Sequence, residues 1–265
     1  MFLEKVRILW NKKVGSLYYR IGLKCHRGYF GAKPGQFLML RVSGRINPLL
    51  RRPFSIHRLI APDGHPEGVE LLYKVAGEGT QRLSRYKKGA YVDILGPLGN
   101  GFSIPGNCHH IFIVAGGIGV APMLFLASDL KKKGIDLTKS MVFLGGRSRD
   151  DLLCEKDFMS LGIRPRPITE DGSAGEKGLV TDPLEMAIKK DRPDIICACG
   201  PVGMLRVVAR IAAKHTVPCQ VSIETIMACG MGACLGCAVA IKGESDKYLH
   251  ACRDGPVFDA NVLKI

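Results

Sequence analysis

The sequence lacks an apolar run long enough to cross a membrane. Its longest run covers residues 111–127 and contains three glycines and a proline, whereas a spanning helix needs about 20 apolar residues. The first fifteen residues carry charges inside their apolar stretch, unlike a secretory signal peptide. We therefore expect a cytoplasmic protein without a membrane partner, in which ten cysteines do not form a disulfide framework.

Acidic residues are also scarce. The chain has 24 Asp and Glu against 38 Lys and Arg, which gives a net charge of +14. Such a charge can serve nucleic acid, a membrane surface or anionic small molecules. The basic residues are mostly scattered, and no nucleic-acid-binding motif occurs. We expect a solvated basic surface and no nucleic-acid partner, with part of the excess available to cofactor phosphates or an acidic partner protein.

The first 100 of the 265 residues read as β-structure. Gly, Pro and Asp interrupt short apolar or alternating runs about every ten residues, a pattern typical of a barrel or sandwich. The expected strands are residues 4–13, 17–25, 35–43, 54–60, 69–77 and 90–99. A short helix is expected at 83–89.

After residue 102 strands and helices alternate. Strands are expected at 110–117, 140–146, 164–171 and 195–200, and helices at 121–134, 149–162, 179–194 and 201–216. This βα rhythm is typical of a parallel sheet, which a strand at 218–224 is expected to close. We predict a multidomain β plus α/β protein with an antiparallel β-barrel (1–102), a parallel α/β nucleotide-binding domain (103–221) and a small C-terminal domain (222–265).

Four cysteines near the C-terminus have the spacing of metal ligands. Cys229, Cys234 and Cys237 form C-x4-C-x2-C, and Cys252 follows 15 residues later. That is the thiolate spacing of plant-type [2Fe–2S] proteins, and the intervening glycines let backbone N–H groups approach the sulfurs. Structural zinc prefers two separated pairs of cysteines, so the spacing favours the cluster and leaves zinc as the alternative. The other six cysteines have no ligand spacing and are expected mostly in the core.

A glycine-rich turn joins the first strand of the α/β region to its helix. Its glycines are Gly116, Gly117 and Gly119. They would let a dinucleotide pyrophosphate lie against the helix N-terminus, although the pattern is not G-x-G-x-x-G and also suits a tight turn without a ligand. A later strand of the same sheet ends in Cys199, Gly200 and Pro201, and ligands bind at such strand ends.

Two segments of the barrel region could bind phosphate. In "RRPFSI", Arg52 can contact a phosphate through two N–H groups, and Ser55 can add a hydroxyl. In "YKVAGEGT", Gly79 and Thr80 can add a backbone and a hydroxyl donor. Taken alone, these segments equally describe a barrel strand with a surface arginine.

The motifs together resemble those of a known family. A barrel with R-P-x-S, a sheet domain with G-G-x-G-x-x-P and a later C-G-P are similar to the ferredoxin–NADP reductase family. The segments "ETIMACGMGACLGCAV" and "CRDGPVFDA" are similar to the electron-transfer subunits of NAD-dependent dihydroorotate dehydrogenases. The resemblance covers essentially the whole chain, and its C-terminal part is the most specific.

This resemblance implies three redox cofactors. NAD(H) would be the co-substrate of the α/β domain, and the four cysteines named above would hold a [2Fe–2S] cluster. The barrel would bind FAD through Arg52, Pro53, Phe54, Ser55, Leu72, Tyr73, Lys74, Gly79 and Thr80. Lys74 stands where many relatives have arginine, so a bidentate phosphate contact is not expected there.

The resemblance also implies an electron relay without an acid–base catalytic residue. Electrons would pass from the FMN of a dihydroorotate dehydrogenase catalytic subunit through the cluster and FAD to NAD+, in pyrimidine (UMP) biosynthesis. The assembly would be a heterotetramer with two copies of each subunit. The alternatives are the small subunit of an NAD-dependent ferredoxin–NADP oxidoreductase or of a sulfide dehydrogenase and, from another class, a zinc-stabilised nucleic-acid-binding module. Arg147, Ser148 or Arg149 would contact the adenosine ribose, and an arginine there could accept the 2′-phosphate that distinguishes NADP from NAD.

Overall fold

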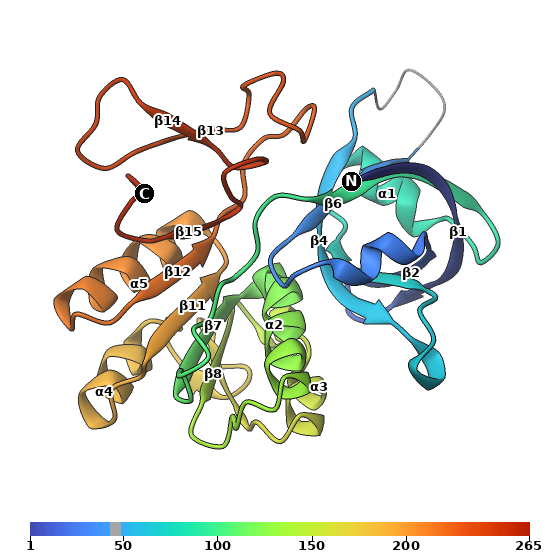
Figure 1. The fold of residues 1–265 in the computed structure, drawn as a ribbon. Coiled ribbons are helices and arrows are strands. Elements are labelled where there is room, and N and C mark those ends of the chain that lie inside the picture. The colour runs from blue at the N-terminus through green and yellow to red at the C-terminus, as the bar shows by residue number, and fades with distance from the viewer. Residues whose placement is uncertain (43–48) are drawn as a thin grey trace.

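The computed structural model describes residues 1–42 and 49–265 of the chain. These residues form a β-barrel, a sheet covered by helices on both faces, and a C-terminal segment that lies over one end of the sheet and reaches toward the barrel (Figure 1). No helix within the described ranges combines the length and apolar character needed to cross a membrane.

The barrel is closed and antiparallel, as predicted. Its strands follow the order β1–β2–β5–β4–β3–β6. They are β1 (Phe2–Lys13), β2 (Tyr18–Lys24), β3 (Phe37–Arg41), β4 (Arg52–Ile60), β5 (Gly68–Lys74) and β6 (Tyr91–Leu98). Apolar side chains such as Ile8, Leu38 and Ile94 fill its interior, because alternate residues of each strand point inward. Ser43, the last residue of the expected third strand, lies outside the described residues.

The helix of the barrel lies earlier than predicted. The sequence suggests residues 83–89, whereas α1 covers Glu78–Ser84. The Thr80 hydroxyl oxygen accepts N–H groups from Ala76 (2.9 Å) and Gly77 (3.1 Å), and so holds the turn that starts the helix. The prediction was wrong because it extended the preceding strand to Gly77, whereas β5 ends at Lys74, and left Gly79 and Thr80 in the connection before the helix.

The second region is a seven-stranded sheet in the order β10–β9–β8–β7–β11–β12–β15. Its parallel strands are β7 (Ile111–Gly116), β8 (Met141–Gly146), β9 (Pro165–Thr169), β10 (Glu176–Lys177), β11 (Ile195–Cys199) and β12 (Cys219–Ser222). The helices are α2 (Val120–Lys132), α3 (Glu155–Ser160), α4 (Asp182–Lys190) and α5 (Val202–Lys214). Helices α2 and α3 pack on one face, and α4 and α5 on the other. Strand β7 is therefore buried throughout.

Two predictions for this region were wrong. The helix expected over 149–162 is broken into a 3-10 turn at Arg149–Asp151 and the short α3. Cys154 precedes α3 with a φ of 66°, a left-handed conformation that interrupts a right-handed helix. Strand β12 also does not close the sheet, because β15 (Val257–Asp259) pairs with it in antiparallel orientation.

The C-terminal segment contains all four of the spaced cysteines. A cysteine loop (residues 224–237) leads into a hairpin of β13 (Ala238–Ala240) and β14 (Tyr248–His250). A return segment (residues 251–256) follows the hairpin and leads into β15. The segment that carries the cysteines thus supplies an edge strand of the α/β sheet.

Candidate functional site

The four thiols lie in two pairs. The sulfur atoms of Cys237 and Cys252 are 3.2 Å apart, and the Cys234 thiol donates a hydrogen bond to Cys229. Within residues 1–42 and 49–265, no three His, Cys, Asp or Glu side chains are arranged around one metal-ion position. Two pairs of sulfurs suit a binuclear [2Fe–2S] centre, in which each iron takes two thiolates.

Backbone N–H groups point at these sulfurs. The Gly232 N–H donates to the Cys252 sulfur at 3.1 Å, and those of Met231 and Cys234 donate to the Cys229 sulfur at 3.4 Å. Burial opposes ionisation of Cys229, but these donors and the Cys234 thiol lower its pKa to about 6. Burial and the contact with Cys237 raise the pKa of Cys252 to about 12. The donors fit a bound cluster, because they offset the negative charge of its thiolates.

The cysteine loop has an inner and an outer side. Cys237 and Cys252 are buried, and Cys234 is exposed. On the inner side, a Cβ added to Gly230 would lie 2.4 Å from the Met39 Cγ atom, so the loop packs directly on β3 of the barrel.

The outer side of the loop is apolar. Ile226, Met231 and Leu235 are 87%, 49% and 59% exposed. These three side chains, called here the apolar rim, belong to the loop that also carries the exposed Cys234, and exposed apolar side chains of this kind suit a surface that another protein covers.

The predicted FAD residues lie on β4, on β5 and around α1. Arg52 is half-buried, and a Cβ added to Gly79 would lie 3.1 Å from its Nε atom. The guanidinium group therefore lies beside the backbone of the first turn of α1, where a Cβ at position 79 would press on it. This position fits a cofactor phosphate, because arginine side chains and the backbone N–H groups of a turn are common phosphate donors. Ser55, also on β4, is half-buried.

Other predicted FAD residues use their side chains to pack. Phe54 and Tyr73 are buried and meet edge to face with ring centroids 5.9 Å apart. The Tyr73 hydroxyl donates to Asn11 at 3.1 Å, and Leu72 is buried as well. Pro53 remains half-buried. Phe54, Leu72 and Tyr73 can therefore offer a cofactor mainly their backbone.

Lys74 lies at the boundary between the barrel and the α/β sheet. Its Nζ atom is 3.5 Å from the Asp151 carboxylate and 5.1 Å from the centre of the Tyr18 ring. Tyr18 donates a hydrogen bond to Asp151, and the Arg147 N–H donates to it at 3.2 Å. Burial opposes ionisation of Asp151, but Tyr18 and Lys74 hold its pKa below the usual value. Sequence reasoning missed Asp151, because only the tertiary structure brings it to Lys74.

The two predicted nucleotide-binding motifs lie side by side. Cys199 pairs in register with Ala115 on β7, and a Cβ added to Gly119 would lie 2.2 Å from the Cys199 carbonyl oxygen. A Cβ added to Gly116 would likewise lie 2.9 Å from Pro201. Gly117 has a φ of 52° and open space beside it.

Burial raises the pKa of the Cys199 thiol to about 12, so the thiol is neutral. The structure thus brings the glycine turn and the Cys199–Pro201 motif, which includes Gly200, to one end of adjacent parallel strands, where nucleotides bind in such folds. Because β8 pairs with β7 up to Gly145, residues 147–149 follow at the same end of the sheet.

Strand β4 connects these motifs. The His57 Nδ1 atom lies 2.9 Å from the Ala121 carbonyl oxygen at the start of α2. Pro53, on the same strand, pairs in register with Met39, which contacts Gly230 of the cysteine loop. Strand β4, which carries the predicted FAD residues Arg52–Ser55 and is called the flavin strand below, therefore lies between the glycine turn and the cysteine loop.

Two family models match the chain. The iron-sulfur cluster binding domain of dihydroorotate dehydrogenase B matches residues 224–264, and the oxidoreductase NAD-binding domain matches residues 113–210. The first match agrees with iron, rather than zinc, at the four cysteines.

Two curated relatives match over nearly their full length. Both are named dihydroorotate dehydrogenase B (NAD(+)), electron transfer subunit. The one from Caldanaerobacter subterraneus subsp. tengcongensis is 42% identical over 262 residues, 98% of this chain and 97% of the relative. The one from Clostridium acetobutylicum is 39% identical over 257 residues, 97% of this chain and 95% of the relative.

Two solved structures share the architecture. The NADH-dependent reduced ferredoxin-NADP oxidoreductase, studied for flavin-based electron bifurcation, has a TM-score of 0.85 and 29% identity and covers 98% of this chain and 89% of its own. A Neisseria gonorrhoeae ferredoxin NADP+ reductase with bound FAD and NADP has a TM-score of 0.67 and 16% identity over 80% of this chain and 91% of its own. At that identity the second likeness shows the fold alone.

Proposed function

Because the chain belongs to the family of electron transfer subunits of dihydroorotate dehydrogenase B (NAD(+)), we propose that it passes electrons from a dihydroorotate dehydrogenase catalytic subunit to NAD+. The catalytic subunit would contain FMN and oxidise dihydroorotate in pyrimidine biosynthesis. The electrons would pass through the [2Fe–2S] cluster and FAD.

One observation carries this proposal. Strand β4 touches the start of α2 through His57 and lies in register beside β3, on which the cysteine loop packs. The strand with the proposed FAD residues therefore lies between the other two proposed sites, which supports a relay from cluster to nicotinamide. FAD supplies hydride exchange with the nicotinamide and single-electron exchange with the cluster, whereas the protein binds and orients the cofactors.

The roles of the residues follow from their surroundings. Arg52 and the backbone beside Gly79 would hold the FAD phosphates, and the open space at Gly117 would admit the NAD(H) pyrophosphate. Cys229, Cys234, Cys237 and Cys252 would bind the cluster, with N–H groups offsetting its charge. We also propose domains at 1–102, 103–221 and 222–265, with β15 crossing from the third into the sheet of the second.

The catalytic subunit would dock on the apolar rim of the cysteine loop. Ile226, Met231 and Leu235 surround the exposed Cys234 in the sequence and are themselves exposed. Covering this rim would bury apolar surface and bring the partner's FMN toward the outer side of the cluster. On the family resemblance we propose two copies of each subunit.

The test is reconstitution with the cognate catalytic subunit. The purified chain, loaded with FAD and cluster, is mixed with that subunit, dihydroorotate and NAD+, and formation of NADH is followed. We expect NADH only when both subunits are present. A fully loaded chain that yields none with its cognate subunit would refute the proposal.

A second candidate is the small subunit of an NADH-dependent ferredoxin–NADP oxidoreductase. The solved oxidoreductase structure with a TM-score of 0.85 favours it. In the matching assay NADH and reduced ferredoxin are the electron donors and NADP+ is the acceptor, and formation of NADPH there without formation of NADH from dihydroorotate would select this candidate.

A further inference from the structure

Asn100, at the end of the barrel, forms hydrogen bonds with the return segment that contains Cys252. The Asn100 Nδ2 atom donates to the carbonyl oxygens of Arg253 (3.1 Å) and Asp254 (3.0 Å). The Asn100 backbone N–H donates to the carbonyl oxygen of Gly255 at 2.5 Å. A single residue therefore binds the three carbonyl groups that follow a predicted cluster ligand.

The two backbones meet without intervening side chains. Gly99 has a φ of 72°, and a Cβ added there would lie 2.5 Å from the Gly255 carbonyl oxygen. The Gln36 side chain donates to the Gly99 carbonyl oxygen at 2.6 Å. Gln36 directly precedes β3, which pairs with the flavin strand β4. Asn100 thus belongs to a short, hydrogen-bonded path from the return segment to the FAD-bearing strands.

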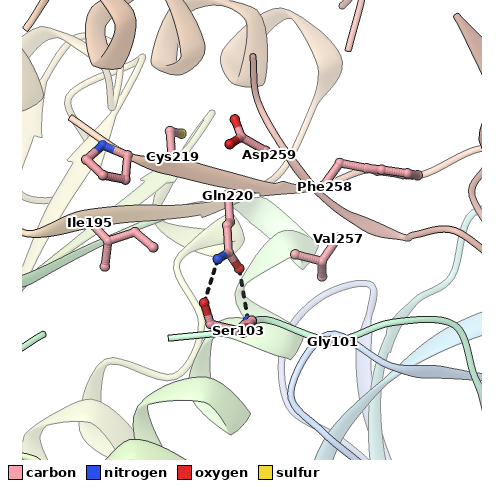
Figure 2. A pocket seen from close by; sticks show the side chains of 9 residues that line it. Gly101, Ser103, Ile195, Cys219, Gln220, Val257, Phe258 and Asp259 are labelled. Carbon is pink, nitrogen blue, oxygen red and sulfur yellow. Dashed lines mark hydrogen bonds between the residues drawn. The ribbon is translucent and has the colours of Figure 1, made fainter. Parts of the chain in front are cut away.

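The same stretch is also held at its other end (Figure 2). The Ser103 N–H donates to the Gln220 side chain at 3.0 Å, and that side chain donates back to the Ser103 carbonyl oxygen at 2.6 Å. Gln220 lies on β12, next to β15, and these strands line a cavity of about 210 Å³ together with Gly101 and Ser103. Residues 99–103 are therefore fixed both to the return segment and to the strand that pairs with its continuation.

We propose that Asn100 is a positioning residue, which sets the place of the Cys252 side of the cluster relative to the flavin and thereby the rate of electron exchange between them. This inference rests on the proposed relay. The return segment consists of turns, so few of its carbonyl groups are hydrogen-bonded to a neighbouring strand. The N–H groups of Asn100 supply hydrogen-bond donors to these carbonyl groups and so hold the segment in place.

The test compares Asn100→Ala and Asn100→Asp with the control Asn107→Ala. Asn100 is exposed, so alanine leaves no core cavity, and Asn107 is an exposed asparagine of the same interdomain connection. Asn100→Asp keeps the size but directs a carboxylate at two carbonyl oxygens, so its effect should exceed that of alanine. Iron, sulfide and FAD contents are measured first. NADH is then mixed anaerobically with each protein, and flavin bleaching and cluster reduction are timed separately.

We expect full cofactor content and unchanged flavin bleaching, with cluster reduction slowed by on the order of tenfold. Backbone amides of residues 252–255 should exchange hydrogen faster in both Asn100 variants than in the control. Wild-type rates of cluster reduction in both variants would overturn the inference, and so would loss of the cluster itself, which would assign Asn100 to assembly. If NADH bleaches the flavin but never reduces the wild-type cluster, the proposed relay fails instead.

Discussion

Gly230→Ala probes the contact between the cysteine loop and the barrel. Gly230 has a φ of 73°, and the new Cβ would lie 2.4 Å from Met39 Cγ and 3.1 Å from its sulfur atom. The left-handed backbone costs an alanine about 1–2 kcal/mol, and overpacking against the buried Met39 adds about 1–3 kcal/mol. The loop must therefore move away from β3 or lose stability.

The matched control is Gly243→Ala. Gly243 has a φ of 81°, and no atom lies within 4 Å of an added Cβ. An alanine there therefore has the unfavourable left-handed backbone but no steric clash with a neighbouring side chain. The difference in unfolding free energy between the two variants isolates the packing contribution. At about 2–4 °C per kcal/mol for a chain of this size, the melting temperature of Gly230→Ala should lie several degrees below that of the control.

Two assays follow this prediction. Thermal unfolding of the loaded protein gives the stability difference, and the rate of cluster reduction by NADH reports the displacement of the loop from β3. Equal melting temperatures for the two variants, with equal rates of cluster reduction, would refute the packing of the loop on Met39.

Three further predictions concern the other sites. Cys234→Ser should remove the cluster absorbance and paramagnetic signal but spare reduction of the flavin by NADH; equal loss of both would show that the loop supports the flavin site. Gly119→Ala places a Cβ 2.2 Å from the Cys199 carbonyl oxygen, so NADH titrations should show weaker binding at unchanged FAD content. Burial lowers the pKa of His57 to about 3, so the unfolded chain binds the extra proton below about pH 6.5 and stability should fall from there toward pH 3. His57→Asn should flatten this pH dependence in thermal unfolding, and an unchanged slope would exclude His57 as its source.

Much of the fold could be predicted because its signals are local. The barrel strands show apolar alternation and glycine punctuation, and the parallel strands show continuous apolar runs before amphipathic helices. The C-x4-C-x2-C spacing is also local, and the structure places its three thiols together with that of Cys252 in two pairs with backbone donors. Such patterns can be recognised in a single sequence because each depends on residues a few positions apart.

The missed features depend on distant partners. Strand β15 is three residues long in a segment rich in turns, and only its pairing with β12 makes it a strand. The break before α3 requires the left-handed backbone of Cys154, and the neighbouring residues in the sequence do not predict that conformation. The contact between Lys74 and Asp151 joins residues 77 positions apart. Each is decided by tertiary packing, which overrides local propensity.

The position of β15 has a consequence for biosynthesis. The nucleotide-binding half of the protein lacks its last strand until residues 257–259 have left the ribosome, long after β7 to β12 have been made. A nascent or truncated chain would expose β12 as an unpaired edge, and such edges recruit strands from other molecules. Docking of residues 257–259 therefore completes the cluster's surroundings and also covers the backbone of β12 with a short antiparallel strand.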